Sequence, residues 1–269
     1  MTPYSGLAGS SSPAGWLAVA GLGPGGAQWV TPEVSQALAE ATDIVGYRSY
    51  VARVEPRPGL VLHASDNGDE LVRAAHALSL AEQGRRVVVV SSGDPGVFAM
   101  AAAVFEALEQ GPLAWRALDL RVLPGVSAML AAAAQIGAPL GHDFCAINLS
   151  DNLKPWDLLE HRLRLALQGD FVVALYNPRS QARPHGFARA LELLRGTCGE
   201  AEAARRPLVF ARCVCTPQQH LRVVTLSQAR PEMADMRTLV IVGSSQSRLI
   251  ERDGVPWVYA PRSAPRAGR

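Results

Sequence analysis

Short, strongly apolar runs alternate along this chain with longer segments in which apolar residues recur every three or four positions. The short runs have the length and the β-branched residues of strands, and the longer segments have the periodicity of helices. Two of the runs, Arg86–Ser91 and Phe171–Tyr176, are apolar almost throughout, which is typical of strands covered on both faces. The alternation predicts an α/β fold.

The predicted elements follow one another closely and leave short connections. Strands are expected at Trp16–Gly21, Asp43–Gly46, Leu60–His63, Arg86–Ser91, Asp119–Leu123, Phe144–Leu149, Asp170–Tyr176, Pro207–Ala211, Leu221–Thr225 and Thr238–Val242. Helices are expected at 32–41, 67–84, 97–110, 126–136, 155–167 and 183–195. The first helix has a well-marked start, because Thr31 can cap it and Pro32 suits its first position.

Half of the predicted strands precede the Pro124-Gly125 pair and half follow it. We therefore expect two α/β domains, residues 1–124 and 125–269, with the active site in the cleft between them. The ends at 1–14 and 262–269 are rich in small residues, proline or arginine, and we expect them to be frayed. Residues 122–141 carry no charge, but prolines and glycines interrupt them, so we expect a turn and a core helix instead of a membrane span.

The composition excludes several classes of protein. Apolar residues make up 48% of the 269 residues and charged residues 19%, which excludes a disordered chain. The net charge of +2 does not favour binding to nucleic acid. No basic residue precedes Arg48, so we do not expect a signal peptide. We expect a cytoplasmic location. No metal site or disulfide framework is predicted from the cysteines, which are Cys145, Cys198, Cys213 and Cys215.

A glycine-rich loop, Gly21–Gly26, follows the first predicted strand and matches the G-x-G-x-x-G pattern. A dinucleotide site needs a helix that starts at the third glycine and holds the pyrophosphate on its free N–H groups. Here the helix starts only near Thr31, and Pro24 removes one N–H group from the loop. A nicotinamide oxidoreductase is therefore disfavoured, and the loop is either a plain turn or the contact of another ligand.

Three further motifs lie where predicted strands end, which is where open α/β sheets bind ligands. Ser91–Phe98 contains Asp94 within a Gly-Asp-Pro-Gly turn, and Leu123–Ala128 places Ser127 at a helix start. Turn chemistry for Asp94 and helix capping for Ser127 remain alternatives to ligand binding. The segment Ala174–Ser180 carries more polar side chains than a turn requires, and it favours a binding site.

Two segments flank the predicted strand that starts at Phe144. His142 and Asp143 precede the strand, and residues 150–156 follow it with Asp151 and Lys154. Histidine titrates near neutral pH, so general acid–base chemistry is one interpretation of these groups, and an ordinary structural role is the other. The remaining histidines are scattered and show no metal-ligand spacing.

In this order, the motifs at residues 19–25, 93–95 and 124–128 resemble those of the tetrapyrrole methylases, a family of S-adenosylmethionine-dependent enzymes. Longer stretches at 91–98, at 140–145 with 149–151, and at 174–180 are similar to members of this family that act in corrin synthesis. The resemblance covers about residues 16–250. Ser127 departs from it where relatives often have threonine, and Asn148 departs where serine is commoner.

The resemblance implies two α/β domains that bind S-adenosyl-L-methionine in their cleft, release S-adenosyl-L-homocysteine, and form a homodimer. The donor carries no phosphates, so a neutral, backbone-rich site suits it. The cofactor contacts carried over from the family are Pro24, Gly93, Asp94, Val97, Phe98, Ser127, Ala128, Asn177, Arg212, Cys213 and Leu239.

The resemblance also implies an acceptor: a hydroxylated precorrin with several carboxylates, which is methylated and ring-contracted. Candidates for moving protons are Asp143, His142, Asp151 and Lys154, and candidates for binding the acceptor are Arg48, Tyr176 and Arg179. A cobalt-containing acceptor and a tetrapyrrole carrier without turnover remain alternatives. A ribosomal-RNA methylase is disfavoured by the charge and by an aromatic content of 6%.

Overall fold

The structure is a computed structural model of the 269-residue chain, and it describes residues 15–66 and 68–263. It divides into two compact units: the residues up to Gly23 together with Ala27–Val126, and Pro24–Gly26 together with the chain from Ser127 onward. The division after Val126 lies close to the expected boundary at 124 and 125. The expected frayed ends fall outside the described residues, except for Arg262 and Ser263.

The first unit contains a five-stranded sheet with the order β3-β2-β4-β1-β5, in which every neighbouring pair is parallel. Its strands are β1 (Trp16–Gly21), β2 (Asp43–Tyr47), β3 (Val61–Ser65), β4 (Arg86–Ser91) and β5 (Asp119–Leu123). Its helices are η1 (Ala27–Trp29), α1 (Pro32–Glu40), α2 (Arg48–Val51), α3 (Glu70–Glu82), α4 (Met100–Gln110) and η2 (Leu113–Ala117).

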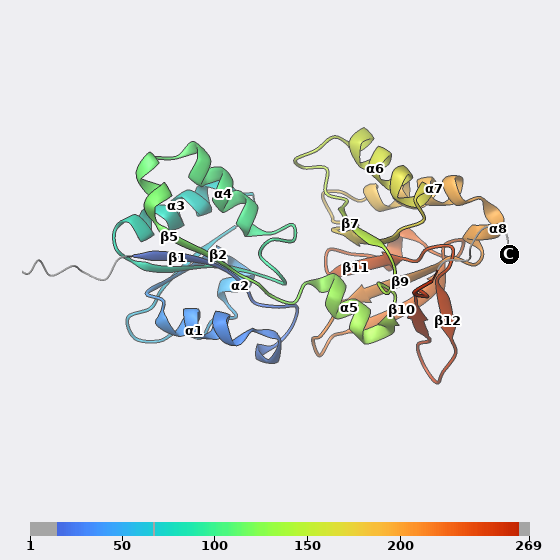
Figure 1. Ribbon diagram of the computed structural model, residues 1–269, viewed down its shortest axis with the longest axis horizontal. Helices are drawn as coiled ribbons and strands as arrows, with labels where there is room; N and C mark the ends of the chain where they lie inside the picture. Colours follow the sequence, from blue (N-terminus) through green and yellow to red (C-terminus); the bar gives the residue numbers. More distant parts are fainter. Residues whose placement is uncertain (1–14, 67, 264–269) are drawn as a thin grey trace, which may run out of the picture. The chain divides into compact units, whose positions relative to one another are not determined.

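Strand β1 is buried along its whole length because helices cover both faces of the sheet. Leu17 and Val19 pack with residues of α3 and α4, whereas Ala18 and Ala20 pack on the side of α1. Figure 1 shows α3 and α4 on one face of this sheet and α1 on the other. The continuous apolar runs of the sequence therefore mark strands with two buried faces. Since all strands are parallel, their carboxyl ends share one edge.

The second unit contains a mixed sheet with the order β10-β9-β11-β8-β7 and a small sheet with the order β12-β13-β6. In the mixed sheet β7, β8 and β9 point the same way, while β10 and β11 run against them. The strands are β6 (Gly137–Ala138), β7 (Phe144–Asn148), β8 (Val172–Tyr176), β9 (Pro207–Arg212), β10 (His220–Thr225), β11 (Thr238–Val242), β12 (Arg248–Ile250) and β13 (Trp257–Tyr259). The helices are α5 (Ala128–Ile136), α6 (Trp156–Gln168), α7 (Gly186–Cys198), α8 (Glu200–Ala203) and η3 (Pro231–Met233).

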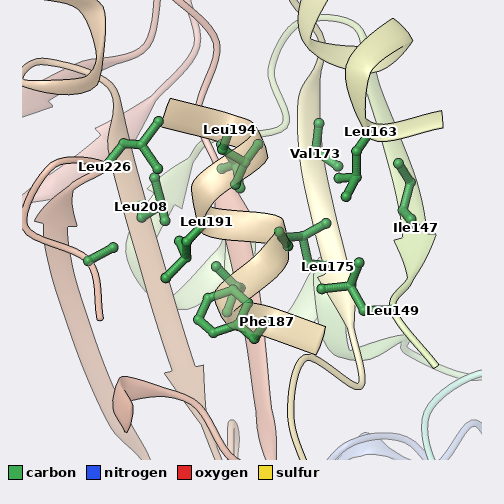
Figure 2. Packing of buried hydrophobic residues seen from close by; sticks show 14 of the residues in the cluster. Ile147, Leu149, Leu163, Val173, Leu175, Phe187, Leu191, Leu194, Leu208 and Leu226 are labelled. Atoms are coloured by element: carbon green, nitrogen blue, oxygen red, sulfur yellow. The ribbon is translucent and has the colours of Figure 1, made fainter. Parts of the chain in front are cut away.

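Helices α6 and α7 form the core of the second unit against one face of the mixed sheet. Leu163 of α6 and Phe187 and Leu191 of α7 belong to one core cluster with Val173 and Leu175 of β8, and Figure 2 shows Leu163 beside Val173. All five side chains have 0 or 1% of their surface exposed. Truncation of such a leucine to alanine removes about 2–5 kcal/mol of stability, so this packing holds β8 and its loop in place.

Several elements differ from those expected. The small sheet was not predicted, because strands of two or three residues show no periodicity. The strand expected from Asp170 begins at Val172, since Asp170 has a positive φ of 54°. Helices α4 and α7 each begin three residues later than expected, which places Val97, Phe98 and Arg183 in loops. The two α/β units themselves confirm the predicted fold class.

Within the described part of the chain, no helix is both long and apolar enough to cross a membrane. The uncharged stretch 122–141 instead forms the end of β5, a turn, α5 and the short strand β6.

Candidate active site

The loops that leave β1, β4 and β5 meet at the carboxyl edge of the first sheet through their backbones. Gly23 and Gly93 exchange two N–H···O hydrogen bonds of 3.1 Å, and both have positive φ angles, of 64° and 66°. A Cβ atom on Gly21 would lie 2.4 Å from the carbonyl oxygen of Gly93, and one on Gly125 would lie 2.3 Å from the same oxygen. Only glycine permits these approaches. The three motifs therefore form one surface of backbone groups, which we call the glycine surface.

Asp94 holds two parts of the glycine surface together. Its Oδ1 accepts a hydrogen bond from the N–H of Gly96 at 2.8 Å, which is the local turn bond expected of aspartate. Its Oδ2 accepts a second bond, from the N–H of Gly125 at 3.0 Å. The turn chemistry left open by the sequence is thus present, and the second bond exceeds what a turn needs.

Val97 and Phe98 lie in the loop between Asp94 and α4. Phe98 has a φ of 54° and leaves 46% of its surface exposed. A non-glycine residue in this conformation stores about 1–3 kcal/mol of strain, and such residues concentrate at functional sites. The loop after Asp94 therefore exposes an aromatic residue at some energetic cost.

Arg53 is a further residue of this edge, and it was not among the residues selected from the sequence. Its Nη1 donates to the carbonyl oxygen of Gly23 at 3.0 Å, and its Nη2 donates to that of Leu22. Burial lowers the pKa of its guanidinium, although the nearby Tyr50 counteracts this. Arg53 follows the short helix α2, outside every recognised motif, so nothing in the sequence marks it.

The carboxyl edge of the second sheet collects the ends of β7, β8 and β9. Asn148, the last residue of β7, accepts hydrogen bonds on Oδ1 from the N–H of Ser150 at 2.9 Å and from Nδ2 of Asn177 at 3.1 Å. One side chain thereby ties the loop after β7 to the loop after β8. Asn148 was noted in the sequence only as a departure from the family.

Three residues that follow β8 and β9 adopt left-handed backbone conformations. The φ angles are 50° for Asn177, 48° for Cys213 and 62° for Cys215. A Cβ atom on Gly25, which belongs to this unit, would lie 2.0 Å from the carbonyl oxygen of Cys215. Strain and close backbone approach therefore coincide at this edge, as they do at the first sheet.

Ser127 occupies the N-cap position of α5 without capping it. Its side chain is 3% exposed, and its hydroxyl has no hydrogen-bond partner among the described residues. The N–H of Met129 instead donates to the hydroxyl of Tyr176 at 3.1 Å, so β8 supplies the cap. The capping role left open for Ser127 is thus not what its hydroxyl performs. A buried hydroxyl without a partner is unfavourable, and it points to a missing acceptor or donor.

Residues at the start of β11 complete the second edge. Asp235 accepts from Nε of Arg212 at 2.8 Å and from the hydroxyl of Thr238 at 2.7 Å. Burial raises the pKa of the Asp235 carboxyl, but these hydrogen bonds outweigh it and the pKa falls below its usual value. Arg212 is therefore held in an ion pair, and Leu239 beside it is 4% exposed.

The structure does not bring the four candidate proton-transfer residues together. His142 and Asp143 precede β7 and lie at the amino edge of the sheet, whereas Asp151 and Lys154 follow β7 at the carboxyl edge. The five residues of β7 separate the two edges by roughly 15 Å. His142 uses Nδ1 to accept the N–H of Asp143 at 2.8 Å, and Asp143 is 79% exposed. The four candidates for proton transfer therefore divide into two pairs at opposite edges of the second sheet.

Lys154 is partly buried in the loop after β7. Burial lowers the pKa of its ammonium group, and the positive charge of Arg162 lowers it further. A lysine with a lowered pKa can exchange a proton closer to neutral pH.

The candidate arginines for acceptor binding differ in their surroundings. Arg48, in the first unit, pairs with Asp66 at 3.2 Å, and both side chains are about two-thirds or more exposed. Arg179 lies in the loop between β8 and α7, in the second unit. The same loop contains Arg183, which the sequence did not single out; its side chain is only 14% exposed.

Residues 17–230 match the family model of the tetrapyrrole (corrin/porphyrin) methylases. The chain is 52% identical over 249 residues to a precorrin-3B C(17)-methyltransferase from Sinorhizobium sp. The match covers 92% of this chain and 96% of that protein. It is 37% identical over 229 residues to a probable cobalt-factor III C(17)-methyltransferase from Salmonella typhimurium, covering 85% and 92% of the two chains.

Among solved structures, the crystal structure of the methyltransferase CobJ is similar to this chain. The TM-score is 0.86 at 63% sequence identity, and the match covers 92% of this chain and all of that one. Because the match covers 92% of this chain, the similarity extends through both α/β units.

Proposed function

The chain belongs to the tetrapyrrole methylases, and we propose that it transfers a methyl group from S-adenosyl-L-methionine to carbon 17 of precorrin-3B, contracting the ring to give precorrin-4. The observation that carries the proposal is the 52% identity to a precorrin-3B C(17)-methyltransferase over 92% of the chain. The reaction belongs to the biosynthesis of cobalamin. Both the fold and the strained loops at the strand ends are compatible with this assignment.

Two features of the chain fit the proposed donor. The hydroxyl of Ser127 is buried without a hydrogen-bond partner among the described residues, and the loops of the glycine surface approach one another too closely to admit side chains. Uncharged groups of this kind suit a donor without phosphates. We assign its binding to Pro24, Gly93, Asp94, Val97, Phe98, Ser127, Ala128, Asn177, Arg212, Cys213 and Leu239, following the family resemblance.

When bound, the donor supplies an electrophilic methyl group on its sulfonium. Direct displacement of that methyl group requires orientation and exclusion of water, and no nucleophile from the protein. The bonds of Asp94 to Gly125 and of Arg53 to Gly23 keep the loops of the first unit in one conformation. We therefore assign these two side chains the task of holding the glycine surface rigid.

Ring contraction requires that the acceptor's tertiary hydroxyl lose its proton while the lactone opens. We assign to the Asp151 carboxylate the acceptance of this proton, with Lys154 as a cation of the same loop, because both residues follow β7 at the carboxyl edge of the second sheet. His142 and Asp143 lie at the opposite edge and receive no part in this step. Arg48 and Arg179 are assigned to acceptor carboxylates, and Tyr176 to the acceptor's polar groups.

A cobalt-containing acceptor is the second candidate. The relative from Salmonella typhimurium named for cobalt-factor III is 37% identical, against 52% for the relative named for precorrin-3B. This difference favours the cobalt-free acceptor. We further infer, from the family resemblance, that the protein is a cytoplasmic homodimer that binds neither membrane nor nucleic acid. Light scattering of the purified protein would test whether it is a dimer.

The decisive experiment incubates purified protein with methyl-labelled S-adenosyl-L-methionine and precorrin-3B, with and without cobalt, and determines the product mass. In the reaction without cobalt, we expect a product that carries one labelled methyl group and a contracted ring. Methylation that requires cobalt would favour the second candidate, and binding of the tetrapyrrole without methyl transfer would favour a carrier.

A further inference from the structure

Arg183 lies at the point where the loops of the second unit's carboxyl edge converge. Its backbone is fixed by a turn, in which its N–H donates to Oγ of Ser180 at 3.0 Å and its carbonyl accepts from the N–H of Ser180 at 3.3 Å. The side chain then runs inward and retains only 14% exposure. The guanidinium is thus presented by a fixed loop.

The contacts of this guanidinium are all long. Its Nη1 donates to the carbonyl oxygens of Asn177 at 3.4 Å and of Leu149 at 3.5 Å, and its Nη2 lies 3.9 Å from the sulfur of Met236. Its ion-pair partner among the described residues is Asp151, whose Oδ1 lies 4.0 Å from Nε. Charge-assisted hydrogen bonds of arginine to carboxylate are normally about 2.7–2.9 Å.

Two other arginines of the same unit form close ion pairs with carboxylates. Arg206, with 3% exposure, lies 2.8 Å from Asp170 and also pairs with Glu202. Arg212 lies 2.8 Å from Asp235 although it is far more exposed. Removing a charge from water is unfavourable unless a close counter-charge replaces the lost hydration. Arg183 is largely removed from water, yet within the described part of the chain its carboxylate partner, Asp151, is 4.0 Å away.

From these contacts we propose that Arg183 binds one carboxylate side chain of the acceptor and thereby sets its position over the second sheet. The inference rests on the proposed function, because it takes a carboxylate-rich tetrapyrrole as the ligand. The bidentate guanidinium fits a carboxylate, and the neighbouring Asp151 then lies beside the bound acceptor. In this assignment Arg183 is a specificity-determining residue, and Asp151 is still the group that accepts the proton of the acceptor's hydroxyl.

The test compares Arg183→Gln and Arg183→Lys with the matched control Arg195→Gln. Arg195 also donates to carbonyl oxygens, those of Leu226 at 3.1 Å and of Ala229, but it belongs to helix α7. We expect Arg183→Gln to raise the KM for precorrin-3B roughly ten- to a hundredfold, while the Kd for S-adenosyl-L-homocysteine changes by less than about twofold. The lysine variant should recover part of the loss because it keeps the charge. Arg195→Gln should leave the KM unchanged and lower the Tm.

Equilibrium binding of uroporphyrin III, which carries eight carboxylates, separates this inference from the proposed function. If the wild-type protein does not methylate precorrin-3B, the proposed function fails, but weaker uroporphyrin III binding by Arg183→Gln than by Arg195→Gln still supports the carboxylate subsite. A wild-type KM and wild-type uroporphyrin III binding in Arg183→Gln overturn it. Equal losses of acceptor and S-adenosyl-L-homocysteine affinity in both Arg183 variants also overturn it, because they indicate a structural role.

Discussion

The Oδ2 atom of Asp94 accepts a hydrogen bond from the backbone N–H of Gly125 at 3.0 Å, across 31 residues of sequence. The bond joins the loop after β4 to the loop after β5, and Oδ1 meanwhile closes the local turn at Gly96. A turn residue and a ligand contact were the two roles that the sequence suggested. The structure adds a third role, in which Asp94 fixes the distance between two loops.

This arrangement predicts a double effect of Asp94→Asn. An asparagine has one carbonyl oxygen, so its NH₂ group must face one of the two backbone N–H groups that the carboxylate now accepts. Loss of a charge-assisted bond should remove about 1.5–3 kcal/mol from the free energy of unfolding. The displaced loop should also weaken S-adenosyl-L-homocysteine binding about tenfold or more. Urea unfolding and titration calorimetry measure the two effects.

Asp143→Asn is the matched control, because Asp143 lies at the amino edge of the second sheet and is 79% exposed. It should change neither the stability nor the affinity for S-adenosyl-L-homocysteine. Wild-type affinity in a folded Asp94→Asn protein would return the Gly-Asp-Pro motif to ordinary turn chemistry.

The central strands of the first sheet could be predicted from sequence because burial on both faces leaves a plain signal. Trp16–Gly21 and Arg86–Ser91 have the expected bounds, since every position is constrained by a helix layer. The strands β6, β12 and β13 gave no such signal, because they bury few side chains and contain two or three residues.

The site was only partly predictable. The order of His142, Phe144 and Asp151 along the chain already places the first two at the start of β7 and the third past its end, so their separation could have been inferred. The contacts of Arg53 and Arg183 could not be predicted, because both side chains donate to main-chain carbonyl groups, which every residue type supplies. Only the folded backbone reveals which carbonyl oxygens lie within reach.

The late start of α1 predicts that the protein distinguishes S-adenosyl-L-homocysteine from NAD. Helix α1 begins at Pro32, six residues after the glycine loop, and only the three-residue 3₁₀ turn η1 (Ala27–Trp29) follows Gly26 directly, so no α-helix begins there to hold a pyrophosphate. S-adenosyl-L-homocysteine at a hundred times its Kd should add about 2.7 kcal/mol of stability, or about 5–10 °C in Tm. NAD at the same concentration should produce no shift in differential scanning fluorimetry. Equal shifts with both ligands would contradict the donor assignment.

A buried carboxylate at the amino edge of the first sheet predicts a pH-dependent stability. Asp43 is 2% exposed at its side chain, and it accepts from Arg85 at 2.7 Å, His63 at 2.9 Å and Thr42 at 2.7 Å. Burial raises the pKa of Asp43, but these bonds outweigh it and bring the pKa below 3.8. A lowered carboxyl pKa stabilises the folded state above the unfolded pKa of about 3.9, and this contribution is lost as the pH falls through the folded pKa.

Asp43→Asn should therefore lower the free energy of unfolding by about 1.5–3 kcal/mol at pH 7, and the difference from wild type should shrink below pH 4. Urea titrations at pH 7 and pH 3 measure this. Asp119→Asn is the control, because Asp119 and its partner Arg121 are both about half-exposed and such a pair contributes less than about 1 kcal/mol. A difference for Asp43→Asn that is the same at both pH values would show that the carboxylate charge is not responsible.

The orphaned hydroxyl of Ser127 predicts opposite signs for stability and binding. This buried group has no hydrogen-bond partner among the residues that the structure describes, so Ser127→Ala removes an unfavourable desolvation and should leave the Tm unchanged or raise it. If the hydroxyl bonds the donor, the same change removes one hydrogen bond, worth about 0.5–1.5 kcal/mol or roughly two- to tenfold in the Kd for S-adenosyl-L-homocysteine. Thr31→Ala is the matched control at another N-cap, where the side chain does accept the N–H of Val34 at 3.3 Å. That variant should lose about 0.5–2 kcal/mol of stability and keep its affinity. A lower Tm with unchanged affinity in Ser127→Ala would assign Ser127 to the fold alone.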